Sequence, residues 1–208
     1  MMKKSEMKKA SLKKPSKLES KIKEINSFNL GKSKLVLYKH PSLHELKEFK
    51  MHHQVTIVIS LLNPLKDKVR VNQISKDCQS LEIKNINIPL VNSDIEYLEQ
   101  ENVITLIKNH LIEIVKTFKE TNNVILLHCQ LGVHRTGLMA YTILRIFGDN
   151  KNKALEHLKF LREKAYDKVG DARLKYAEKY LLPFFLKPEP SHHEELKGNN
   201  KEDVKEKK

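Results

Sequence analysis

A cysteine and an arginine, separated by five residues, follow an apolar segment in the middle of the chain. Residues 124–127 have the composition of a buried strand, and Cys129 and Arg135 bracket a short loop before a helix begins. Backbone N–H groups that point into such a loop, together with the positive end of the helix, form an anion-binding nest. A cysteine at its base has a lowered pKa and is a thiolate, and the fork of Arg135 binds two phosphate oxygens at once. These residues predict attack of Cys129 on phosphorus, followed by hydrolysis of a cysteinyl-phosphate.

The other residues of this loop have separate predicted roles. Gly132 lets the backbone pass close to an anion, and Thr136 offers its hydroxyl to the thiolate and assists breakdown of the intermediate. His128, directly before the nucleophile, is expected to hydrogen-bond the loop from behind. The residues expected to surround the phosphate are Gln130, Leu131, Gly132, Val133, His134 and Arg135.

Residues 128–137 carry a family resemblance. His128-Cys129, five further residues and Arg135-Thr136-Gly137 resemble the signature of the cysteine-dependent protein tyrosine and dual-specificity phosphatase superfamily. Weaker similarities at 39–42, 87–90 and 162–173 resemble its small atypical "Swiss army knife" group. The resemblance covers about residues 34–183. It implies a dual-specificity phosphatase fold and hydrolysis of phosphomonoesters on tyrosine, serine or threonine, with no cofactor and no metal.

The general acid is the least defined part of the predicted site. The resemblance implies an aspartate on a mobile loop some thirty residues upstream of the nucleophile, and this position falls on Asn92. Since an amide cannot donate a proton in that way, Asp94 is the provisional acid. The alternative for Asp94 is a cap of the helix that follows. His134 is a second candidate acid, and a side chain at the mouth of the pocket is its alternative role.

Three substrate classes and one non-enzymatic role remain open from the sequence. The favoured partner is a phosphorylated protein. The absence of lysine from 130–134 argues against highly phosphorylated inositols, and an RNA 5′-triphosphatase, which needs no aspartate acid, suits the basic charge of +13. A catalytically weak adaptor that binds phosphorylated residues is the alternative from another class. Arg162 and Arg173 are either part of a second anion site or surface arginines.

Length and composition predict one domain with two tails. Of the 208 residues, 1–24 are lysine-rich and 187–208 are polar, so both segments are expected to be disordered, with the catalytic domain over 25–186. No apolar run is long enough for a membrane span, and no secretory signal is visible. With Cys129 assigned to chemistry and Cys78 a bystander, we expect a monomer in a reducing compartment, the cytoplasm or the nucleus.

The hydrophobic pattern alternates between strands and helices. Strands are expected at 35–38, 55–62, 81–88 and 124–128, and helices at 41–51, 75–79, 99–120, 134–148, 151–164 and 171–182. This order predicts an α/β fold with a mostly parallel central sheet flanked by helices on both faces. The nucleophile then lies at the carboxyl end of a central strand, where such folds bind ligands.

Overall fold

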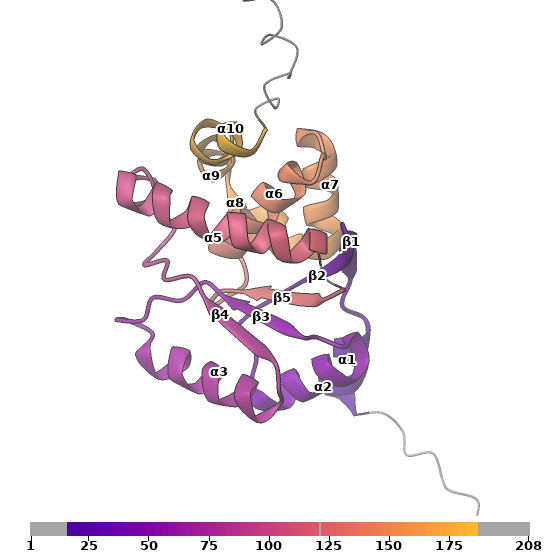
Figure 1. The fold of residues 1–208 in the computed structure, drawn as a ribbon. Coiled ribbons are helices and arrows are strands. Elements are labelled where there is room, and N and C mark those ends of the chain that lie inside the picture. Colours follow the sequence, from indigo (N-terminus) through magenta and orange to yellow (C-terminus); the bar gives the residue numbers. More distant parts are fainter. Residues whose placement is uncertain (1–15, 121, 187–208) are drawn as a thin grey trace, which may run out of the picture.

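A central sheet lies between two layers of helices (Figure 1). The structure is a computed structural model that describes residues 16–120 and 122–186, so the parts of the predicted tails at 1–15 and 187–208 lie outside the described residues. The expected α/β architecture with a mostly parallel sheet is confirmed.

The sheet has the strand order β1-β2-β5-β3-β4. The strands are β1 (Ser27–Leu30), β2 (Ser33–Tyr38), β3 (Ile57–Ser60), β4 (Lys84–Asn87) and β5 (Val124–His128). β2, β5, β3 and β4 run parallel, while β1 pairs antiparallel with β2 through a tight hairpin. The carboxyl ends of the four parallel strands therefore meet at one edge of the sheet.

Both faces of the sheet are covered, as the near-continuous apolar composition of the strands requires. In β2, Leu35 and Leu37 belong to one hydrophobic core, and Val36 and Tyr38 belong to the other. The same alternation divides the side chains of β3 and β5 between the two cores.

One face is covered by α1 (Lys17–Lys23), α2 (Leu43–His53) and α3 (Lys68–Ser80), which lie below the sheet in Figure 1. Helix α2 begins with a capping box, in which the Ser42 hydroxyl accepts from the Glu45 N–H and the Glu45 carboxylate accepts from the Ser42 N–H. This cap fixes the start of α2 directly after the end of β2.

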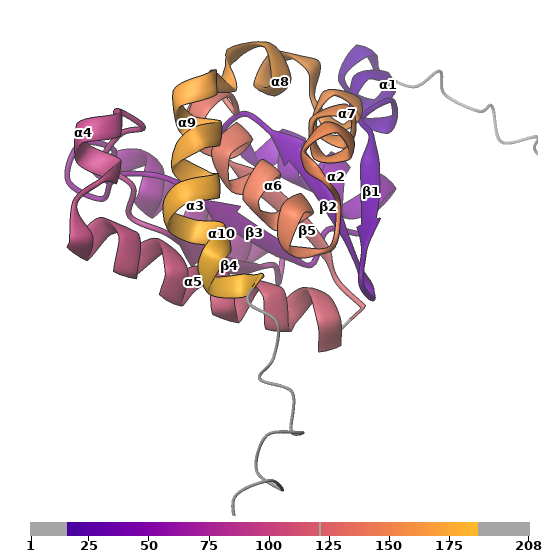
Figure 2. The ribbon, with the colours of Figure 1, turned by 90° about the horizontal axis from the view of Figure 1, so that it is seen from above.

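The opposite face is covered by the remaining helices, which Figure 2 shows from above. They are α4 (Ile95–Leu98), α5 (Glu101–Glu120), α6 (His134–Ile146), α7 (Lys151–Leu161), α8 (Glu163–Val169), α9 (Asp171–Tyr176), a π-helical turn (Ala177–Leu181) and α10 (Leu182–Phe185). Helix α5 buries an apolar stripe, with Leu106 half-buried at its margin; the buried members are Val103, Ile107, Leu111, Ile114, Val115 and Phe118.

The structure differs from the sequence prediction in several segments. Residues 17–23, expected in a disordered tail over 1–24, form α1, because Ile22 is fully buried and its carbonyl accepts a hydrogen bond from the ring of His53 at 2.8 Å. The helix expected over 151–164 is interrupted at Arg162, whose backbone is extended between α7 and α8. The short antiparallel β1 was not expected from the sequence.

None of the helices in the described part of the chain is long and apolar enough to cross a bilayer.

Candidate active site

The predicted catalytic loop lies at the carboxyl edge of the sheet, between the end of β5 and the start of α6. β5 is central, with β2 on one side and β3 on the other. Cys129 follows its last residue, is only 4% exposed, and lines a pocket of about 170 Å³. The fold therefore places this thiol where open parallel sheets bind their ligands.

Three successive carbonyl groups of the loop are bound by donors from outside it. The backbone N–H of His40 donates to the carbonyl of Gln130 at 3.2 Å. Arg162 donates from Nη2 to the carbonyl of Leu131 at 3.2 Å and from Nε to that of Gly132 at 2.7 Å. In a trans peptide the N–H points opposite to the carbonyl, and the described residues contain no cis bond. The N–H groups of the same three peptide bonds belong to Leu131, Gly132 and Val133. They therefore point away from these donors, as an anion-binding nest requires.

Gly132 is required at its position by both conformation and space. Its φ is +66°, a left-handed conformation that side chains rarely adopt. A Cβ atom added there would lie 2.1 Å from the carbonyl oxygen of Tyr38, which is far closer than atoms can approach. The loop thus packs directly on the end of β2, and this contact fixes the position of the loop relative to the sheet.

The surroundings of Cys129 favour its thiolate. Burial raises the pKa of the thiol, but hydrogen bonds from the Thr136 hydroxyl and from the N–H groups of Val133 and Thr136, together with the charge of Arg135, outweigh burial and lower the pKa. Thr136 is fully buried, and its hydroxyl has no nitrogen or oxygen partner among the described residues. This hydroxyl is therefore available to the sulfur.

His128 lies fully buried behind the loop. Its Nε2 is 2.8 Å from the hydroxyl of Ser60 on β3, and its Nδ1 is 3.3 Å from the carbonyl oxygen of Cys129. Burial, with a smaller contribution from the neighbouring His40, lowers the pKa of His128 to about 3. The ring is neutral at physiological pH and holds the backbone of Cys129 against β3.

The facing wall of the pocket is the segment between β4 and α4. Arg135 donates from Nη1 to the carbonyl of Leu90 at 2.9 Å, and Arg173 donates from Nε to the carbonyl of Ser93 at 2.8 Å. Two arginines from different helices thus hold this segment against the catalytic loop. Arg162 and Arg173, for which the sequence leaves open a second anion site or a place on the surface, both donate to backbone carbonyls.

Asp94 lies at the end of this wall and lines the same pocket as Cys129. It is exposed, and although it occupies the N-cap position of α4, its side chain makes no capping hydrogen bond. Asn92, where the resemblance implies the acid, accepts a hydrogen bond from the N–H of Asp94 through its side-chain oxygen at 3.0 Å. The asparagine thereby shapes the loop, and the carboxylate two residues later faces the pocket unengaged.

His134, the first residue of α6, also lines the pocket and is exposed. Partial burial and the positive charges of Arg173 and Arg135 lower its pKa, and the Asp94 carboxylate acts in the opposite direction. The two candidate acids of the sequence prediction, Asp94 and His134, therefore both line the pocket that contains Cys129.

The pocket brings together the predicted loop and the predicted acid. Its lining residues are Val91, Asn92, Ser93, Asp94, Cys129, Gln130, Leu131, Val133, His134 and Arg135. Arg135 is the one permanently charged cation among them, and no lysine contributes. No cluster of three metal-ligating side chains occurs in the described part of the chain.

Neither a family model nor a curated protein matches the sequence. Solved structures do match the fold. The human tyrosine phosphatase-like serine/threonine/tyrosine-interacting protein is 17% identical, with a TM-score of 0.54 over 76% of this chain and 96% of that one. PTPMT1 is 12% identical, with a TM-score of 0.52 over 74% and 93%. The core catalytic domain of the PP-IP phosphatase SIW14 from S. cerevisiae is 16% identical, with a TM-score of 0.50 over 74% and 83%.

These similarities define the class of the fold. The chain has the fold of the cysteine-dependent phosphatase superfamily, and the resemblance read from residues 128–137 is confirmed at that level. Sequence identities this low establish the fold but not the substrate, so the chemistry has to be argued from the residues of this chain.

Proposed function

We propose that the chain is a cysteine-dependent phosphatase that hydrolyses phosphomonoesters, with phosphorylated protein side chains as its substrates. The observation that carries this proposal is the geometry of the loop. Three of its carbonyl groups accept hydrogen bonds from donors outside the loop, so its amide N–H groups face Cys129, which is buried and has a lowered pKa. Preorganised N–H groups around a thiolate stabilise the charge that builds on the equatorial oxygens of a transferring phosphoryl group.

The reaction takes place in two steps. The Sγ thiolate of Cys129 attacks phosphorus, the bond from phosphorus to the ester oxygen breaks, and that oxygen takes a proton from Asp94 and leaves as an alcohol. A water molecule then attacks the cysteinyl-phosphate, Asp94 accepts its proton, and the thiolate is released together with phosphate. Thr136 stabilises the departing thiolate, and Arg135 clamps two phosphoryl oxygens in both steps.

The size and charge of the pocket favour a single phosphate at the end of a larger substrate. At about 170 Å³ it is smaller than the roughly 300–1,000 Å³ of sites that enclose a whole small molecule. A highly phosphorylated inositol would bring several phosphates to a pocket with one arginine and a carboxylate. A phosphorylated side chain enters with one phosphate and leaves the rest of the polypeptide outside.

The test is hydrolysis of a small aryl phosphate between about pH 5 and pH 8 by the reduced protein. Cys129→Ser is expected to abolish turnover. Cys78→Ser is the matched control, because Cys78 is buried among apolar residues away from the pocket lining and its pKa is raised to about 12 by burial. Equal activity of native protein and Cys129→Ser would refute the proposal.

A second comparison tests the assigned acid. Asp94→Asn should slow hydrolysis of an alkyl phosphate by about 10²-fold or more. An ester whose leaving group needs no proton should be almost unaffected. A uniform effect on both esters would remove Asp94 from the role of acid.

A further inference from the structure

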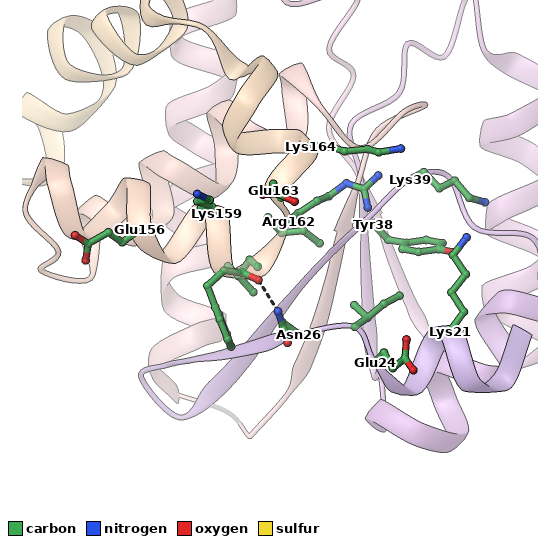
Figure 3. A pocket seen from close by; sticks show the side chains of 14 residues that line it. Lys21, Glu24, Asn26, Tyr38, Lys39, Glu156, Lys159, Arg162, Glu163 and Lys164 are labelled. Carbon is green, nitrogen blue, oxygen red and sulfur yellow. Dashed lines mark hydrogen bonds between the residues drawn. The ribbon is translucent and has the colours of Figure 1, made fainter.

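A second and larger cavity adjoins the catalytic loop. It has a volume of about 980 Å³ and lies between α1, the last residues of β2 and the junction of α7 with α8 (Figure 3). Its floor is the end of β2, beyond the point where β1 stops pairing with it. We call this cavity the edge groove.

The walls of the edge groove are tied to each other and to the sheet. The Asn26 side chain donates from Nδ2 to the carbonyl of Phe160 at 2.6 Å and so joins the segment after α1 to α7. The carbonyl of Ile22 on α1 accepts from the His53 ring at 2.8 Å, which fixes α1 on α2. These hydrogen bonds hold the walls of the groove in place.

Four of the five cations that line the groove gather at the end nearest the catalytic loop, and the fifth, Lys159, lies toward the far side. Figure 3 shows Lys164, Arg162, Lys39 and Lys21 directed toward the end where Tyr38 lies, with Glu156 at the far side. Over the Tyr38 ring, Lys39 Nζ lies 5.1 Å from the centroid.

Three of these four cations form no ion pair with a described residue. Lys39 pairs with Glu45 at 2.8 Å. Arg162 binds neutral carbonyls, so its charge remains. Lys21 and Lys164 form no ion pair with any described residue. This end of the groove consequently attracts carboxylates.

Arg162 connects the edge groove to the catalytic pocket. Its guanidinium lines the groove, and the carbonyl of Leu131 that it binds belongs to a residue of the pocket lining. The catalytic loop thus lies between the two cavities, with Arg162 bound to its outer side. A chain whose phosphorylated residue occupies the pocket can place its neighbouring residues in the groove.

We propose that the edge groove binds the polypeptide segment next to the phosphorylated residue and selects acidic side chains there. This inference rests on the proposed function. Its apolar lining, which includes Phe160 at 51% exposure, suits a peptide, and the carboxylates of Glu24, Glu156 and Glu163 oppose a uniformly charged polyanion such as RNA. A peptide with acidic positions near the phosphate satisfies both the apolar and the basic parts of the groove.

The test compares two phosphotyrosine peptides that differ only in having glutamate or lysine at the flanking positions. The native protein should prefer the glutamate peptide in kcat/KM. Lys21→Glu combined with Lys164→Glu should lower the ratio of glutamate to lysine peptide about tenfold, mainly through KM, because each surface charge contact is worth a few-fold. Lys76→Glu with Lys119→Glu is the matched control, since both lysines are exposed outside the groove.

The outcomes separate the two proposals. The inference would be overturned if the ratio of glutamate to lysine peptide were unchanged in the groove variant, or if the control variant changed it equally. In either case, turnover of aryl phosphate would still support the proposed phosphatase activity. A short RNA that competes better than the glutamate peptide would also overturn it. If the native protein hydrolyses no aryl phosphate, the ratio of the two peptide affinities is measured with Cys129→Ser, and adding the two groove substitutions must still lower that ratio.

Discussion

Replacing Thr136 by valine is expected to raise the pKa of the Cys129 thiol. The Thr136 hydroxyl is the foremost of the groups that favour the thiolate, and it is fully buried without a nitrogen or oxygen partner. Valine keeps the branched shape and removes only the donor. A hydrogen bond to a charged group contributes about 1.5–3 kcal/mol, and one pKa unit corresponds to about 1.4 kcal/mol. The expected increase is therefore about 1–2 units.

The assay is the pH dependence of alkylation by iodoacetamide, followed by mass spectrometry of the labelled cysteine. Cys78 does not interfere, because burial raises its pKa to about 12. Thr136→Ser is the control, since it retains the hydroxyl and should titrate close to the native protein. Identical titration of the valine and serine variants would refute the assignment of this hydroxyl to the thiolate.

Two further predictions concern the support of the loop. Gly132→Ala should lower kcat/KM for aryl phosphate by about 10²-fold, because its Cβ cannot fit beside the Tyr38 carbonyl and the loop amides must shift; native-like turnover would contradict this packing. His128 stays neutral in the folded protein down to about pH 3, whereas the unfolded chain binds its proton near pH 6.5. The unfolded state then holds the extra proton, so stability should fall by up to about 1.4 kcal/mol per pH unit as pH decreases through this window. Urea titrations of His128→Gln should lack this part of the slope, and an unchanged slope would show that another group carries it.

The catalytic loop could be predicted from the sequence because its parts are neighbours in the chain. Cys129, Arg135 and Thr136 are joined by one strand, one turn and one helix start, so their spacing alone fixes their approach. The stripe of α5 was equally accessible, since a 20-residue amphipathic helix repeats its signal many times. Helix α1 offered a single buried residue, Ile22, in a lysine-rich segment, which is too little for periodicity to detect.

The contacts that shape the site could not be predicted, because they join distant residues to backbone carbonyls. Arg162 binds carbonyls 30 and 31 residues away, and Arg173 binds one 80 residues away. A carbonyl exists at every position, so no residue type in the sequence marks the partner. The sequence draws attention to both arginines, but only the fold shows that Gly132 lies beside Arg162 and Ser93 beside Arg173.

The same circumstance explains why the proposed acid is harder to predict from the sequence than the proposed nucleophile. The wall that carries Asp94 has no local motif, and its position depends on arginines that belong to helices on the other side of the pocket. One of these is Arg135, which binds the carbonyl of Leu90 with Nη1 while its remaining donors are available to a phosphate. In the proposed mechanism a single guanidinium therefore both binds the phosphoryl group and holds the segment that carries Asp94. It follows that a change at Arg135 disturbs the binding of phosphate and the placement of Asp94 together, so that its effect on catalysis cannot be divided between them.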